Sequence, residues 1–172
     1  MNSVAQRLKQ HLESEGEAYT LLNDVLQEEQ RALVNWSIAD LKEIEEHKDD
    51  ILAKIQKLER RRFRFLQSVQ DKLQQMGLPA SSDQENIRLS DIIVLLDQQE
   101  AKQLQNLQEE LATTVKNVTS ANHKNQVLLK RSLEIVNANL NIYAQSEKLA
   151  KTYNASGQMH AKRDKHLVDG SI

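Results

Sequence analysis

The chain has 172 residues, which suits one domain or at most two, and a formal net charge of −2, which gives no general attraction to nucleic acid or membrane surfaces. It has no cysteine, which excludes disulfides and thiolate metal sites. Four glycines and one proline are too few for the turns of a compact β-rich domain. Gln, Glu, Lys, Leu, Ala and Asn dominate, as in long solvated helices, so we expect an all-α protein.

No segment has the pattern of a membrane span or a signal peptide. The N-terminal "MNSVAQRLKQ" lacks the apolar core of a signal peptide. The longest aliphatic run, residues 92–96, is far too short to cross a bilayer. We therefore expect a cytoplasmic protein with no membrane insertion.

The first predicted helix covers about residues 3–36. Gly16 interrupts it, but the apolar pattern resumes in phase after the glycine. We expect Trp36, at its end, to be a packing plug at the corner rather than a platform for a ligand. Spacings of three, four and seven place the apolar residues on one face: Leu8, Leu12, Tyr19, Leu22, Val25, Leu26, Leu33 and Trp36.

The second predicted helix covers about residues 38–76, with Ser37 as its N-cap. Its apolar residues, from Leu41 to Met76, follow a heptad repeat. Lys48 and Arg62 fall on the same seam, where we expect their stems to pack and their charged ends to reach water.

A strong stop follows in "GLPASSDQEN", residues 77–86, where Gly77 suits a helix C′ position and Pro79 prevents continuation. Ser90 is the expected N-cap of the next segment, and the aliphatic run 92–96 is apolar all round, so we expect it to be buried. We expect a long last helix over about 91–150, and leave open whether 91–97 is a separate short helix. Residues 151–172 lose periodicity and are predicted to form a flexible tail. Short connections make neighbouring helices antiparallel, so we expect an elongated antiparallel three-helix bundle or coiled coil with a long C-terminal helix.

The last helix carries more apolar surface than one packing stripe needs, above all in "NHKNQVLLKRSLEIVNANLNIY", residues 122–143. At 1.5 Å per residue, roughly 13 residues of this helix should extend past a bundle formed with two shorter helices. Asn125, Ser132, Asn139 and Ser146 repeat every seven residues along it. Either these are polar seam residues near water, or they hydrogen-bond a partner helix and set its register.

The residues do not form a recognisable active site or metal site. No histidine follows a glutamate at the Glu-x-x-His spacing of di-iron bundles, and adjacent acid pairs diverge around a helix. We therefore expect no enzyme activity, no metal and no cofactor. The basic cluster "ERRRFRF", residues 59–65, has no wider basic stripe beside it, which favours a solvated helix face over a docking patch for an acidic partner or nucleic acid.

Two motifs near the C-terminus carry a family resemblance. Residues 122–133 read Asn-x-x-Asn-x-x-Leu-Leu-x-x-Ser-Leu, and "TYNASG" follows at residues 152–157. With the helical region 28–62, this pattern resembles the FlgN family of flagellar export chaperones, whose fold is helical.

The resemblance implies a non-enzymatic cytoplasmic chaperone of flagellar type III export. Such proteins bind C-terminal helices of hook-associated proteins, which form the hook–filament junction, and deliver them to the cytoplasmic domain of the export gate. By the resemblance, Tyr153 matches the tyrosine linked to gate docking. Client binding is implied for Asn125, Leu128, Leu129, Ser132 and Leu133, and the same apolar face continues at Val136, Leu140 and Tyr143.

A second function fits the same apolar surplus. A self-assembling coiled-coil scaffold or adaptor without an export role, with its last helix paired in a homodimer, has equal need of an uncovered apolar face. The sequence leaves both open.

Overall fold

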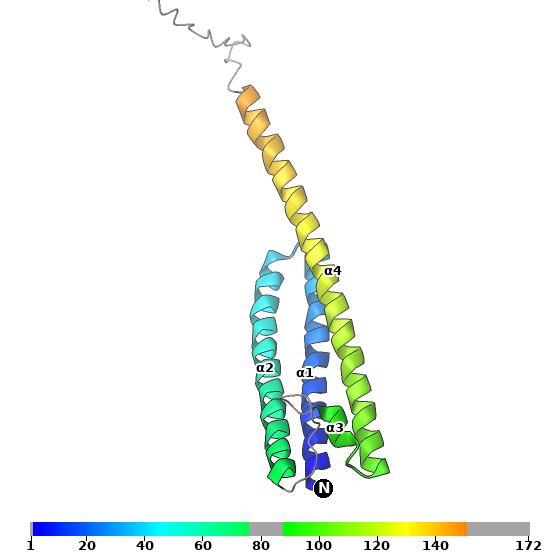
Figure 1. Ribbon diagram of the computed structural model, residues 1–172. Helices are drawn as coiled ribbons and strands as arrows, with labels where there is room; N and C mark the ends of the chain where they lie inside the picture. Colours follow the sequence, from blue (N-terminus) through cyan, green and yellow to red (C-terminus); the bar gives the residue numbers. More distant parts are fainter. Residues whose placement is uncertain (1, 76–87, 151–172) are drawn as a thin grey trace, which may run out of the picture. The chain divides into compact units, whose positions relative to one another are not determined.

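The computed structural model describes residues 2–75 and 88–150, with side chains over 4–75 and 88–146. These residues form four helices and no strand (Figure 1). This confirms the predicted all-α bundle with a long C-terminal helix. The chain divides into two compact units, Met1–Leu129 and Lys130–Ile172, and each is described by itself. The helices are α1 (Asn2–Asn35), α2 (Ile38–Gln75), α3 (Leu89–Ile93) and α4 (Gln98–Ala150).

A tight corner joins α1 to the antiparallel α2. Trp36 adopts a left-handed backbone conformation there, with φ of 57°, which ends α1. The Ser37 N–H then donates to the Ala32 carbonyl at 3.1 Å, and the Leu41 N–H donates to the Ser37 carbonyl at 3.1 Å, which starts α2. A left-handed residue other than glycine costs about 1–2 kcal/mol.

The prediction that Trp36 plugs the corner is wrong. Its side chain is 51% exposed. The heptad repeat of α1 would bury residue 36 only if the helix continued through it. Because the chain leaves the helical path at Trp36, the indole does not follow the buried row.

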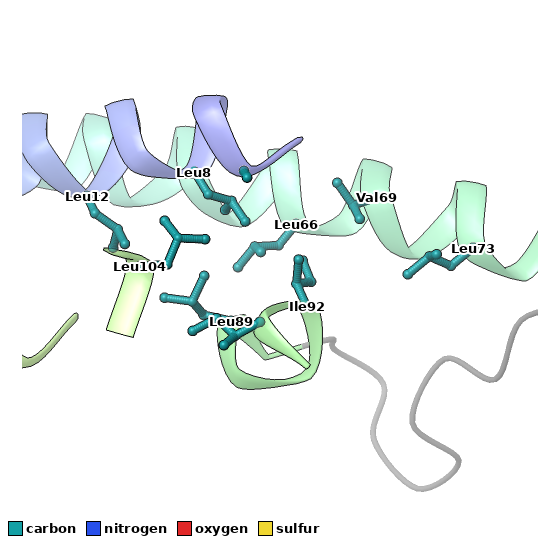
Figure 2. Packing of buried hydrophobic residues seen from close by; sticks show 10 residues of the cluster. Leu8, Leu12, Leu66, Val69, Leu73, Leu89, Ile92 and Leu104 are labelled. Carbon is teal, nitrogen blue, oxygen red and sulfur yellow. The ribbon is translucent and has the colours of Figure 1, made fainter. Parts of the chain in front are cut away.

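The first apolar cluster joins all four helices (Figure 2). Leu104 of α4 is buried among side chains of α1, α2 and α3, and the segment around α3 closes this end of the first unit. The cluster contains Ala5, Leu8, Leu12, Leu66, Val69, Leu73, Leu89, Ile92, Ile93 and Leu104.

The helix predicted over 91–150 is in fact two helices, α3 and α4. Ser90 is not the N-cap of α3, because that position is taken by Arg88, whose N–H donates to the Asp91 carboxylate at 2.9 Å. Asp97 starts α4 by accepting the N–H groups of Gln99 and Glu100 at 3.0 and 2.8 Å. Of the aliphatic run between the caps, Val94 is largely exposed, so the run is buried only in part.

The second apolar cluster lies nearer the corner and joins α1, α2 and α4. Two of its buried members are small, Ala18 of α1 and Ala121 of α4. The remaining buried members are Leu22, Val25, Leu26, Ile51, Ile55 and Val118.

Two ion pairs join α1 to α2. Arg62 Nε donates to the buried Glu15 carboxylate at 2.8 Å, and Lys48 Nζ lies 2.6 Å from Glu29 Oε1. Both basic side chains stay partly exposed, as predicted for seam residues with solvated ends, and α1 in addition supplies a carboxylate for each. Beside them the Tyr19 hydroxyl donates to Glu59 at 2.8 Å, and burial, with this bond, raises the pKa of Tyr19 to about 12.

The three long helices therefore share one seven-residue register. Apolar and polar layers alternate along it, and each layer takes one residue from each helix. Counted in steps of seven from the contacts of Glu29 with Lys48 and Asn125, the members of each layer, in the order α1, α2, α4, are Leu8, Val69 and Leu104, then Glu15, Arg62 and Leu111, then Leu22, Ile55 and Val118, then Glu29, Lys48 and Asn125.

Candidate partner-binding face of the last helix

Asn125 belongs to the last complete layer of the first unit. Its Nδ2 donates to the Leu26 carbonyl and to Glu29 Oε2, both at 2.8 Å, while the other oxygen of Glu29 accepts from Lys48. One carboxylate of α1 thus joins α2 to α4. The Asn125 side chain is 3% exposed.

This placement corrects the prediction that Asn125 contacts a client. A buried amide whose N–H groups are both bound to α1 is not available to a partner in this structure. The heptad position of Asn125 was predicted to hydrogen-bond a neighbouring helix, and it does so. Within the first unit, however, the helix that it binds is α1.

Beyond Asn125, α4 carries two neighbouring rows of residues, each spaced alternately by four and three. The first, here called the seam row, continues the buried positions Val118, Ala121 and Asn125; the second, here called the outer row, starts at Leu129. At 100° per residue such spacing holds each row on one side of the helix. The seam row is Leu128, Ser132, Ile135, Asn139, Ile142 and Ser146, and the outer row is Leu129, Leu133, Val136, Leu140 and Tyr143.

The outer row is exposed along its whole length. The seam row is half-buried at Leu128 and Ser132 and exposed from Ile135 onward. Seven large apolar side chains thus face solvent between positions 129 and 143. Such a contiguous exposed patch is typical of an interaction site, because apolar surface in water is unfavourable.

The structure brings seven of the eight predicted client-binding residues into these two rows, and Asn125 is the exception. The predicted set omitted Ile135 and Ile142, which are exposed and belong to the seam row. The seven-residue repeat through Leu128 could have identified both. Tyr153 lies outside the described residues, as do Gly77, Pro79 and the predicted tail 151–172.

The polar members of the seam row differ in what they bind. The Ser146 hydroxyl donates to the Tyr143 carbonyl of its own helix at 2.8 Å, a local bond that serine often makes within helices. Asn139 is exposed and occupies the position of Asn125 two heptads later. It therefore offers an amide of the kind that Asn125 uses to bind α1.

Other chemistry is not evident in the described part of the chain. No group of three or more His, Asp or Glu residues there could hold a metal ion, and none of its helices is long and apolar enough to cross a membrane. Burial lowers the pKa of His11, whose ring lies 5.5 Å from that of Phe65. In the basic cluster 59–65, Arg62 turns inward to Glu15, while Arg60, Arg61 and Arg64 are exposed.

Comparison with known proteins identifies a family. A family model described as FlgN protein matches residues 1–161. No curated protein and no solved structure matches the chain.

The Asn125 layer makes a testable contribution to stability. Replacing Asn125 with Ala should lower the free energy of unfolding by about 1–2 kcal/mol, because two buried hydrogen bonds are lost while Glu29 keeps Lys48. Urea denaturation followed by circular dichroism measures this free energy of unfolding. Asn139→Ala, at the same heptad position but exposed, is the control and should change stability by less than about 0.5 kcal/mol. Equal effects of the two substitutions would contradict the structural role of Asn125.

Proposed function

Since the chain belongs to the FlgN family of flagellar export chaperones, we propose that it binds C-terminal helices of hook-associated proteins, keeps them unassembled in the cytoplasm and delivers them to the export gate. The observation that carries this proposal is the pair of exposed rows on α4, from Leu129 to Tyr143. We propose no enzymatic activity and no cofactor.

The mode of binding follows from the layers of the first unit. Up to Asn125 the seam of α4 packs against α1 and α2, but α1 ends at Asn35 and cannot continue the register far beyond this point. An amphipathic client helix laid on the exposed rows continues that packing, as in other helix-in-groove complexes. The client then supplies the apolar side chains that α1 supplied earlier along the seam.

Asn139 has a specific place in this proposal. At the matching position Asn125 donates to a backbone carbonyl and to a carboxylate of the neighbouring helix. A client helix with an acidic residue in the layer of Asn139 can accept the same pair of bonds. A single polar seam residue of this kind fixes the register of packed helices.

The energy available to such a complex lies in the apolar rows. Complete burial of one large aliphatic side chain stabilises by about 1.5–3 kcal/mol. Six exposed aliphatic residues and Tyr143 lie in the two rows, so their burial can support a reversible complex after the cost of association is subtracted. Reversibility suits a chaperone that has to release its client at the gate.

Gate docking is proposed for Tyr153 on the family resemblance alone, since this residue lies outside the described part of the chain. It is separate in sequence from both rows of α4. Client binding and delivery are therefore proposed to use different residues.

A self-assembling scaffold is the second candidate. The outer row has the alternating spacing of four and three of a coiled-coil seam, so a second copy of the chain could cover it in a homodimer. If the chain is a scaffold, its partner is a second copy of the same chain. If it is a chaperone, its partner is a helix from another protein.

Charge substitutions on the outer row test the client site. The double variant Leu129→Asp and Val136→Asp should abolish co-purification with a C-terminal peptide of a hook-associated protein, because it places two carboxylates in the apolar contact. Helical content by circular dichroism should stay nearly constant, because both side chains are exposed. Retained peptide binding would contradict the proposed face.

Val127→Asp is the matched control for Val136→Asp. Val127 and Val136 are nine residues apart on α4 and therefore lie on opposite sides of the helix, and they are 38% and 41% exposed. The two single variants carry the same added charge. Only the substitution at Val136 should weaken binding of the peptide.

Substitution of the proposed docking residue separates delivery from binding. Tyr153→Ala should leave the affinity for the client peptide unchanged and reduce secretion of hook-associated proteins into the medium. Lost peptide affinity would instead assign Tyr153 to the client site.

Sedimentation equilibrium distinguishes the two candidate functions. We expect the chaperone alone to form at most a weak dimer, which dissociates when client peptide is added, since both compete for the same rows. A tight dimer that client peptide does not loosen favours the scaffold.

A further inference from the structure

Trp36 combines two features that the fold does not require. Its φ of 57° lies in the left-handed region, where glycine is the usual residue at the end of a helix. Its side chain is 51% exposed, so the indole contributes little to either apolar cluster. A bulky residue held in a costly conformation and directed partly into solvent suggests a contact outside the chain.

Trp36 is part of an apolar patch at the corner between α1 and α2. Val34 and Ile38, on either side of it in sequence, are exposed, while Leu33 just before them is buried. We call Val34, Trp36 and Ile38 the corner patch. A tryptophan with two aliphatic neighbours resembles the anchors that dominate binding energy in protein interfaces.

The corner patch is close in register to the start of the outer row. Asn125 of α4 is bound to Leu26 and Glu29 of α1, and the two helices run in the same direction through this layer (Figure 1). By their shared register Leu129 is level with Leu33, and Trp36 follows three residues later. At 1.5 Å per residue, that is roughly one helical turn. Leu129 and the corner patch all belong to the first unit.

We propose that the corner patch, with Trp36 as its anchor, is a second contact for the client helix of a hook-associated protein. The inference rests on the proposed function, which places that helix over Leu129. The corner patch and Leu129 are apolar, exposed and close in register, so one apolar helix face can cover both.

The client is the favoured occupant because Leu129, the first residue of its proposed site, is exposed and close in register to the corner patch within the same unit. The outer row from Leu129 to Tyr143 is about 21 Å long at 1.5 Å per residue. A client helix of more than about 15 residues extends past one end of it. At the Leu129 end, the corner patch between α1 and α2 offers exposed apolar side chains in the first unit.

The chain provides its own probe, because Trp36 is its only tryptophan. The probe ligand is a synthetic tryptophan-free peptide with the C-terminal helical segment of a hook-associated protein from the same genome. Titration of this peptide should move the Trp36 emission to shorter wavelength as the indole leaves water. The change should saturate at the peptide concentration at which the anisotropy of a labelled peptide saturates.

Substitutions at Trp36 measure the contribution of the anchor. Trp36→Ala and Trp36→Gly should each weaken peptide binding about tenfold or more, and Trp36→Phe should retain most of the affinity. The glycine variant should be more stable to urea than the alanine variant, because glycine accepts the left-handed conformation. Equal losses of affinity in two variants of unequal stability exclude misfolding as the cause.

Phe63→Ala is the matched control. Phe63 is an aromatic residue of α2 with 46% exposure, close to that of Trp36, and it lies outside the corner patch. This variant should bind the peptide as the unmodified chain does. An equal loss at Phe63 would overturn the assignment of the contact to the corner.

The outcomes separate this inference from the function on which it rests. Peptide binding by anisotropy, with unchanged Trp36 emission and unchanged affinity of the Trp36 variants, overturns the corner contact and leaves the client site on α4 intact. No peptide binding at all overturns both. A shift of emission on concentrating the chain without peptide assigns the patch to a second copy and also overturns the inference.

Discussion

The Glu29 carboxylate is the interaction on which the arrangement of the first unit depends. It binds Lys48 of α2 through one oxygen and Asn125 of α4 through the other, so a single side chain of α1 relates all three long helices. Apolar layers alone tolerate sliding by a heptad, because one leucine resembles the next. A buried charge that loses its partners is costly, which makes every other register unfavourable. The Glu15–Arg62 pair two heptads earlier reinforces the same choice.

The exposed rows of α4 follow from this register. Because Asn125 is held level with Glu29, the seam reaches the end of α1 within a few residues of Leu128. The heptad pattern of α4 nevertheless continues to Ser146, and the outer row begins at Leu129. Residues in this continued pattern are exposed from Leu133 onward, as expected for a seam that lacks a packing partner. For a member of a chaperone family, a helix from a client is the natural completion.

Much of the fold could be predicted from local signals. The expected bounds 3–36 and 38–76 lie within one residue of α1 and α2, because long amphipathic helices leave a strong periodic pattern. The sequence left open whether 91–97 is a separate short helix, and the structure separates α3 from α4 at Asp97, an ordinary N-cap residue directly before Gln98. Lys48 and Arg62 were placed on the correct seam, but their partners are 19 and 47 residues away in sequence and left no local signal.

The sequence by itself determined the helical class, the approximate lengths of the helices, the surplus of apolar residues on the last one and the family, because these depend on composition, periodicity and short motifs. Only the tertiary structure decided which of those residues are free. Asn125 and Ser132 are equivalent by heptad position, yet one is buried against Glu29 and the other is half-buried. Trp36 fits the buried row of α1 by spacing, yet a left-handed turn leaves it half exposed. Burial depends on where the neighbouring helix ends, and a periodic pattern within one helix does not contain that information.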